Sequence, residues 1–180
     1  MSRPMKRPGA FLDRDGVLIV DCGYPHRPDQ LVLIPGAAAA VKRLNDAGYV
    51  VVIVTNQSGV ARGLFSEETM HGFNALLVER LAEAGARIDA VYAAPHHAEA
   101  VDERYRHPDH PDRKPNPGML LKAIAEHDLD PARSLMIGDQ ASDMEAARRA
   151  GVAGHRFPEG GDLDHFVAGM LVFSGGFLRP

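Results

Sequence analysis

The chain has 180 residues, which is enough for one domain with its own apolar core. Hydrophobic residues make up 45% of it and charged residues 24%, a composition typical of globular proteins and unlike that of disordered or fibrous ones. The formal net charge of −4 lacks the basic excess of a nucleic-acid-binding protein, and the single cysteine, Cys22, excludes an intrachain disulfide.

The N-terminal segment carries positive charges at Arg3, Lys6 and Arg7, but no apolar run of a signal peptide follows them. Polar and charged side chains also interrupt every apolar run before it reaches the roughly 20 residues of a membrane-spanning helix. We therefore expect a cytoplasmic protein that binds neither nucleic acid nor membrane. Its size favours a monomer.

Short apolar runs predict the buried strands of a parallel sheet, because such strands are apolar on both faces. In chain order they lie at Ala10–Leu12, Val50–Val54, Ile88–Ala93 and Leu135–Ile137. A late strand is expected at His155–Phe157. The glycine-rich tail that follows it, residues 158–180, is expected to form at most one short helix.

Helical patterns lie between these strands. The clearest begins at the N-cap Ser66, carries Glu67 and Glu68 in its first turn, and runs to about Ala84. The others are expected at Ala37–Asp46, Pro117–His127 and Ser142–Ala150, the last of them closed by Gly151. Alternating strands and helices predict a single α/β domain: a doubly wound, Rossmann-like parallel sheet with helices on both faces and no cap domain.

Polar residues follow three of the predicted strands where each strand ends: Asp13–Gly16, Thr55–Ser58 and Gly138–Asp139. In doubly wound folds, ligands bind outside the carboxyl ends of the strands, at one edge of the sheet. The sequence therefore predicts a functional site that these three segments build together.

Asp13 and Asp15 are two like charges so close in sequence that each resists ionising unless a cation lies between them. Mg²⁺ suits such hard oxygen ligands and keeps room for phosphate oxygens. Asp139 is expected to bring a third carboxylate to the same metal. For Asp143, one helical turn further on, a metal-site role and a simple helix-capping role stay equally open.

The remaining polar groups indicate a phosphoryl-binding site. A hydroxyl at Thr55 and the backbone N–H of Asn56 can hold a phosphoryl oxygen, and Lys114 can neutralise the charge of the group in transfer. Taken singly, the Thr-Asn pair also fits an ordinary turn, and the Arg113–Lys114 pair also fits a solvated turn.

Taken in order, these segments resemble the four motifs of the phosphatases of the haloacid dehalogenase superfamily, in the branch related to histidinol phosphatase. The matching stretches read FLDRDGV, DCGYP, TNQSGVARG, RKPNPGMLL and GD. The resemblance implies that Asp13 is the nucleophile and Asp15 the general acid and base. It also implies that Thr55 and Lys114 hold the phosphoryl group, and that Asp13, Asp15 (through its carbonyl) and Asp139 hold Mg²⁺.

The resemblance implies a small sugar phosphate as substrate, with specificity set by the loops Asp21–Gln30, Gly59–Phe65 and Pro95–Asp112. The residues expected to bind it are Asp21, Cys22, Gly23, Tyr24, Asn56, Gln57, Ser58 and Arg113. Two alternatives stay open: a phosphatase for histidinol phosphate or another small phosphomonoester, and a non-catalytic binding module on the same fold. The second would have lost its nucleophile, whereas Asp13 is present.

Two features depart from the family pattern. The family commonly carries a zinc loop with the ligands Cys-x-His and Cys-x-Cys, but here the corresponding places hold no cysteine. Zn²⁺ could still bind through His96, His107, His110 and Asp112; we favour a proline-stiffened loop without metal. Gln140 takes the place of a lysine that contacts substrate in related enzymes, which removes one positive charge from the expected site.

Overall fold

The computed structural model describes residues 5–174, in which five parallel strands form one sheet in the order β3-β2-β1-β4-β5. All neighbouring strands are parallel, as the sequence predicts. The strand order reverses between β1 and β4, which in such sheets opens a crevice at the carboxyl ends of the strands. The strands are β1 (Gly9–Leu12), β2 (Val50–Asn56), β3 (Ala90–Ala94), β4 (Leu135–Gly138) and β5 (Ala153–Arg156).

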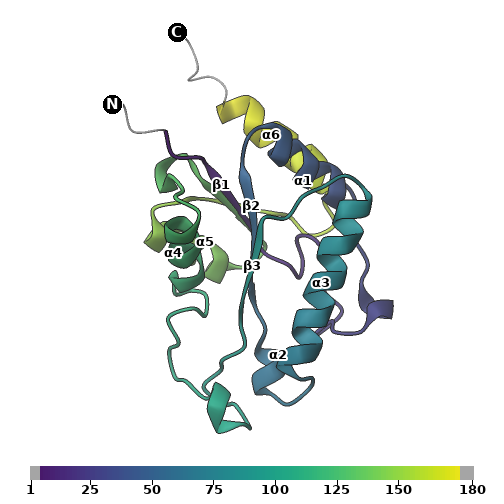
Figure 1. Ribbon diagram of the computed structural model, residues 1–180, viewed down its shortest axis with the longest axis vertical. Helices are drawn as coiled ribbons and strands as arrows, with labels where there is room; N and C mark the ends of the chain where they lie inside the picture. The colour runs from purple at the N-terminus through teal and green to yellow at the C-terminus, as the bar shows by residue number, and fades with distance from the viewer. Residues whose placement is uncertain (1–4, 175–180) are drawn as a thin grey trace.

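Helices cover both faces of this sheet, and each face has its own apolar cluster (Figure 1). One cluster includes side chains of α1 (Ala37–Asp46), α3 (Glu67–Glu83) and α6 (Leu163–Ser174). The opposite cluster includes side chains of α4 (Gly118–Glu126) and α5 (Ala141–Ala150). Covering both faces explains why the strands read as continuous apolar runs.

The helix signals in the sequence are confirmed by the structure. Ser66 caps α3, because its Oγ accepts a hydrogen bond of 3.0 Å from the backbone N–H of Thr69. Gly151 ends α5 in the left-handed conformation with φ of 72°, which glycine adopts without strain. The four predicted helices therefore begin and end within two residues of their expected bounds.

Other elements differ from the prediction. A short helix, α2 (Ser58–Ala61), lies in what looked like a loop, and β5 begins two residues before the expected late strand. The glycine-rich tail contains a 12-residue helix, α6, in which Leu163 and Val167 are fully buried. Three 3₁₀ turns complete the described elements: η1 (Pro28–Gln30), η2 (Glu103–Tyr105) and η3 (Pro131–Arg133).

Within residues 5–174, no helix combines the length and the apolar character needed to cross a membrane.

Candidate active site

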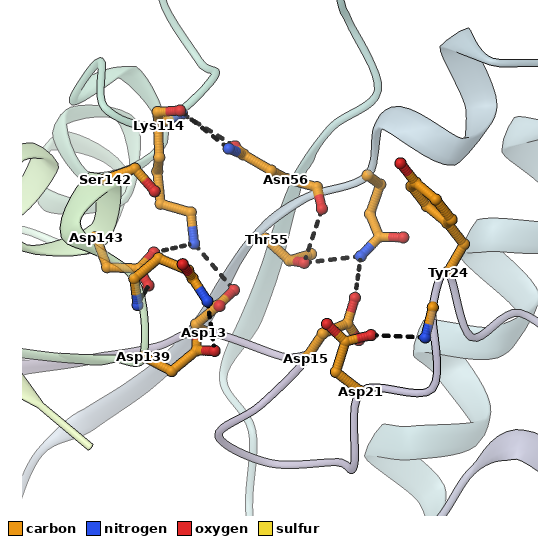
Figure 2. Close-up of a pocket in the computed structure, with 13 residues that line it drawn as sticks. Asp13, Asp15, Asp21, Tyr24, Thr55, Asn56, Lys114, Asp139, Ser142 and Asp143 are labelled. Atoms are coloured by element: carbon orange, nitrogen blue, oxygen red, sulfur yellow. Dashed lines mark hydrogen bonds and ion pairs between the residues drawn. The ribbon is translucent and has the colours of Figure 1, made fainter. Parts of the chain in front are cut away.

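A cavity of about 390 Å³ opens at the carboxyl ends of β1, β2 and β4 (Figure 2). It lies where the sequence predicted the site, because those strand ends carry the three polar segments. The residues that line it are Asp13, Asp15, Asp21, Gly23, Tyr24, Thr55, Asn56, Gln57, Lys114, Asp139, Gln140, Ser142 and Asp143.

Lys114 lies between two carboxylates on one side of this cavity (Figure 2). Its Nζ is 2.9 Å from Asp13 Oδ1 and 2.6 Å from Asp143 Oδ1, and it donates a further hydrogen bond of 2.9 Å to the carbonyl oxygen of Val54. All three charged side chains are buried. A buried ammonium group with three oxygen partners is fully hydrogen-bonded, so its position is fixed.

Burial and charge shift the titration of this group of residues. Burial is the largest effect on Asp13 and, with the negative charge of Asp143, it raises the pKa of the Asp13 carboxyl to about 7 against the opposing effect of Lys114. Burial also opposes the charged form of Lys114, but the two carboxylates outweigh it and hold the pKa of the Lys114 ammonium above its usual value. Lys114 is therefore cationic at neutral pH.

Asn56 fixes the backbone from which Lys114 projects. Its side-chain Nδ2 donates to the Lys114 carbonyl at 3.0 Å, and its Oδ1 accepts from the Lys114 backbone N–H at 2.9 Å. Asn56 was expected to bind substrate through its backbone N–H, a role this contact leaves free. Its side chain instead joins the end of β2 to the lysine-bearing segment, 58 residues further along the chain.

The carboxylates of Asp13, Asp139 and Asp143 form a potential cation site. One oxygen from each lies within 4.8 Å of the others, and this is the one such group of three found among residues 5–174. Asp139 Oδ1 is buried and has no hydrogen-bond partner, so it has an acceptor site to fill. Three carboxylates, one of which has an oxygen without a partner, fit Mg²⁺.

This group adds Asp143 to the carboxylates expected around the metal. The Asp15 carboxylate is not part of the group; the expected contact of Asp15 with a metal is through its backbone carbonyl. Asp143 joins the group and also accepts a hydrogen bond of 3.0 Å from the Gln140 backbone N–H in the capping box of α5. The capping role of Asp143 is therefore observed, and its metal-site role stays a prediction that its place beside Asp13 and Asp139 supports.

The Asp15 side chain also lines this cavity. Its carboxylate accepts hydrogen bonds from Arg14 Nε at 2.8 Å, from Arg14 Nη2 at 3.1 Å and from Gln57 Nε2 at 3.2 Å. The same Gln57 amide donates to Thr55 Oγ1 at 2.8 Å. Gln57 was expected to bind substrate, but its buried side chain mainly connects the side chains of Asp15 and Thr55.

The expected substrate-binding residues divide into two groups. Asp21, Gly23 and Tyr24 line the cavity with Asn56 and Gln57, whereas Cys22, Ser58 and Arg113 do not. Arg113 is half-buried and donates a hydrogen bond of 3.3 Å to the carbonyl of His96. Gln140 and Ser142 line the cavity although neither was expected to bind substrate; Gln140 Nε2 donates to Asp139 Oδ2 at 2.9 Å.

The histidines of the loop Pro95–Asp112 are arranged by stacking. The rings of His96 and His110 lie parallel with centroids 3.7 Å apart, and His107 meets His110 edge-on at 5.1 Å. The Nδ1 atoms of His107 and His110 accept backbone hydrogen bonds, and Asp112 pairs with Lys122. Among residues 5–174 these four side chains do not form a group of potential metal ligands, and they include no thiolate. The loop without zinc stays our prediction.

The residues that sequence reasoning missed are Arg14 and Asn74, which lie behind Asp15. Arg14 Nη1 donates to Asn74 Oδ1 at 2.8 Å, and both side chains are buried. The available signal was a charged residue directly between two site aspartates and next to the buried segment Val17–Ile19. Its partner on α3, 60 residues away, had no signal in the sequence.

The model of one protein family, the haloacid dehalogenase-like hydrolases, matches residues 10–151 of the chain. This range includes β2, β3, β4, nearly all of β1, and the carboxylates of Asp13, Asp139 and Asp143. The chain belongs to this family. The resemblance seen in its motifs is thereby confirmed, and the protein is a hydrolase by family.

Relatives with closely similar sequences carry a more specific name. A protein of Rhodopseudomonas palustris named D-glycero-beta-D-manno-heptose-1,7-bisphosphate 7-phosphatase is 48% identical over 168 residues, covering 93% of this chain and 92% of the relative. A protein of Pasteurella multocida with the same name is 46% identical over 140 residues, covering 78% of this chain and 75% of the relative.

A solved structure agrees with this relationship. The D,D-heptose 1,7-bisphosphate phosphatase of B. bronchiseptica, crystallised in complex with magnesium and phosphate, superposes with a TM-score of 0.76. It is 32% identical to this hydrolase, and the match covers 92% of this chain and 99% of that one.

Proposed function

We propose that this hydrolase is a Mg²⁺-dependent phosphatase that removes the 7-phosphate of D-glycero-D-manno-heptose 1,7-bisphosphate. The observation that carries the chemistry is the buried Asp13–Lys114–Asp143 group beside the unsatisfied Asp139 carboxylate, at the open edge of the sheet. The names of the similar relatives, and the magnesium and phosphate bound by the B. bronchiseptica enzyme, support the substrate and the metal.

The reaction would proceed in two phosphoryl transfers. An Asp13 oxygen attacks phosphorus, the bond from phosphorus to the sugar oxygen breaks, and that oxygen takes a proton from Asp15, which yields an aspartyl-phosphate and the free sugar hydroxyl. A water then gives its proton to Asp15 while its oxygen attacks phosphorus, and the bond to Asp13 breaks. Inorganic phosphate leaves, and both aspartates return to their starting states.

The remaining residues would stabilise charge during these steps. Lys114 and Thr55 would stabilise the phosphoryl oxygens, since both residues line the cavity next to Asp13 and Asp15. Lys114 would act through its charge, because its three N–H groups already have protein acceptors. Asp13, Asp139 and Asp143, with the Asp15 carbonyl, would hold the cation. Bound Mg²⁺ neutralises the charge of the phosphoryl group.

The sugar would bind along the side of the cavity formed by Asp21, Gly23 and Tyr24. The half-buried guanidinium of Arg113, beside the cavity, would attract its distal phosphate. The product would serve the synthesis of the heptose precursor of lipopolysaccharide. We further propose a cytoplasmic monomer of one domain.

A phosphatase for histidinol phosphate or another small phosphomonoester is the second candidate. One observation favours it: Gln140 turns its amide to Asp139, so the position after this aspartate supplies no cation to a second phosphate. A substrate with a single phosphate needs no such cation.

The decisive experiment measures Mg²⁺-dependent phosphate release from both anomers of the heptose bisphosphate and from histidinol phosphate, with Asp13→Asn as the blank. We expect kcat/KM of about 10⁴ M⁻¹s⁻¹ or more on the heptose, at least about 100-fold above histidinol phosphate. The opposite ratio would select the second candidate. If Asp13→Asn kept more than about a tenth of the activity, the aspartyl-phosphate route would be wrong.

A further inference from the structure

Arg14 is a buried cation that the proposed chemistry does not use. It lies between the nucleophile Asp13 and the acid Asp15, and it is only 1% exposed. Removing a guanidinium group from water is costly unless its donors are all satisfied. The contacts that satisfy them therefore indicate what the residue does.

The guanidinium binds Asp15 with two parallel hydrogen bonds and is itself held from three other directions. The two bonds to the carboxylate measure 2.8 and 3.1 Å. Nη1 donates to an acceptor on helix α3, and Nη2, besides its bond to Asp15, reaches acceptors on the segment that follows β2 and in the loop Asp21–Gln30. An aromatic ring of α3 covers one face of the guanidinium, with its centroid 4.8 Å from Cζ. These partners are Asn74 Oδ1 at 2.8 Å, Gln57 Oε1 at 3.1 Å, the Pro25 carbonyl at 3.1 Å and the Phe73 ring.

These contacts together fix the orientation of the guanidinium plane. Because both fork nitrogens bind Asp15, the orientation of Arg14 also sets the orientation of the carboxylate. The Asp15 side chain is 21% exposed and lines the cavity, so part of it remains open to a substrate. The Pro25 contact further joins this carboxylate to the loop that carries the expected sugar-binding residues.

We propose that Arg14 is a positioning residue that orients the Asp15 carboxyl toward the leaving-group oxygen. Through its bond to the Pro25 carbonyl, this orientation also depends on the loop Asp21–Gln30. The proposal rests on the role of Asp15 given under the proposed function. A two-bond fork binds a carboxylate more strongly than a neutral carboxylic acid, so it strengthens as Asp15 gives up its proton. Arg14 therefore favours the transition state in which the leaving oxygen becomes protonated.

Leaving groups of different basicity separate this role from a merely structural one. Phenyl phosphate needs a proton on its leaving oxygen, whereas 2,4-dinitrophenyl phosphate needs almost none. We measure kcat/KM, which reports the steps up to departure of that group, for both substrates with Arg14→Met and Arg14→Lys. We expect both variants to lose about 100-fold on phenyl phosphate, as for a general acid out of position, and less than about threefold on 2,4-dinitrophenyl phosphate. Equal losses on both substrates would overturn the proposal.

The chain offers a matched control in Arg43, which forms the same two-bond fork with Asp164 at 2.8 and 3.0 Å between helices α1 and α6. Arg43→Met should leave kcat/KM on both substrates unchanged. Asp15→Asn, which removes the acid itself, gives the largest loss on phenyl phosphate relative to 2,4-dinitrophenyl phosphate that loss of proton donation can cause. If Asp15→Asn lowers kcat/KM equally on both substrates, the proposed role of Asp15 is wrong; if Asp15→Asn lowers it mainly on phenyl phosphate and the Arg14 variants do not, only the positioning role is wrong.

Asn74→Leu gives a second route if Arg14→Met does not fold. This substitution keeps the branched shape of the side chain and leaves the fork to Asp15 intact, but it removes the acceptor that holds Nη1. We expect a loss of about 5- to 10-fold on phenyl phosphate and none on 2,4-dinitrophenyl phosphate. An unchanged ratio between the two substrates would contradict the positioning role.

Discussion

Gly16 shows how closely the backbone approaches the candidate metal site. Its φ is +84°, and a Cβ at this position would lie 2.4 Å from Asp139 Oδ2. A methyl group there must displace the carboxylate whose other oxygen lacks a partner. We predict that Gly16→Ala raises the Mg²⁺ concentration for half-maximal activity by about 10- to 100-fold.

Gly48→Ala is the control for this prediction. Gly48 has nearly the same φ, +85°, but a Cβ there meets nothing within 4 Å. The backbone strain of the two variants is therefore alike, and only the clash differs. If both variants shift the Mg²⁺ dependence equally, the effect comes from strain and not from Asp139.

Asp13 makes metal binding depend on pH. Burial is the main reason that the pKa of the Asp13 carboxyl is raised to about 7. Below pH 7 the metal-free folded protein therefore holds a proton on Asp13, and a cation must displace this proton to bind. We predict that the apparent Mg²⁺ affinity falls about tenfold per pH unit below 7 and levels off above it. Calorimetric titration at pH 6 and pH 8 measures this. Affinity that does not change with pH, or an equal slope in Asp13→Asn, would contradict the assignment.

Individual site residues differ in how far the sequence reveals them. Asp13 and Thr55 could be predicted because each has a chemistry-bearing side chain at a strand end, and Lys114 because a phosphoryl site needs a cation and the family motif supplies it here. The structure brings all three to one cavity. Arg14 could not be predicted, because its role depends on acceptors at residues 57 and 74 that only the folded chain brings together. The same holds for Gln57, whose amide lies between Asp15 and Thr55 and is not free for a substrate.

At the scale of elements, the loop Pro95–Asp112 depends on neutral imidazoles. Burial lowers the pKa of His96, and the neighbouring His110 lowers it further; burial also lowers the pKa of His110. A histidine whose folded pKa is depressed stabilises the fold above its unfolded value of about 6.5, and this contribution is lost as pH falls. The stack should therefore weaken in acid.

We predict that the double variant His96→Phe/His110→Phe, which keeps two stacked rings, loses less of its Tm between pH 7.5 and pH 5 than the unmodified protein. The difference should be about 4 °C. His71→Phe, at an exposed position of α3, is the control and should behave like the unmodified protein. One equivalent of Zn²⁺ should leave Tm unchanged at pH 7.5; a rise would mean that the histidines bind the metal after all.

The elements that could be predicted are those whose local signals agree with their packing. Strands buried on both faces and helices with a clear N-cap or a closing glycine were located within two residues or so. The exceptions are α2, only four residues long, and α6, whose glycine-rich surroundings hid a helix that tertiary contacts stabilise. Local composition says little about a helix of this kind, because its stability comes from the surface it covers.

For the molecule as a whole, α6 completes the core on one face of the sheet. Leu163 and Val167 are fully buried in the same apolar cluster as α1 and the strands, and the fork between Arg43 and Asp164 joins α1 to α6 at the surface. The helix stands apart from the residues that line the candidate active site. Its contribution should therefore be to stability and not to catalysis.

We predict that Leu163→Ala lowers the free energy of unfolding by about 2–4 kcal/mol, the usual cost of a cavity at a fully buried leucine. Urea unfolding monitored by circular dichroism measures the change. Val172→Ala, at a side chain 76% exposed on the same helix, should change it by less than about 0.5 kcal/mol. At 25 °C the folded fraction of both variants should keep its kcat on phenyl phosphate. A fall in kcat with Leu163→Ala alone would mean that α6 also supports the geometry of the site.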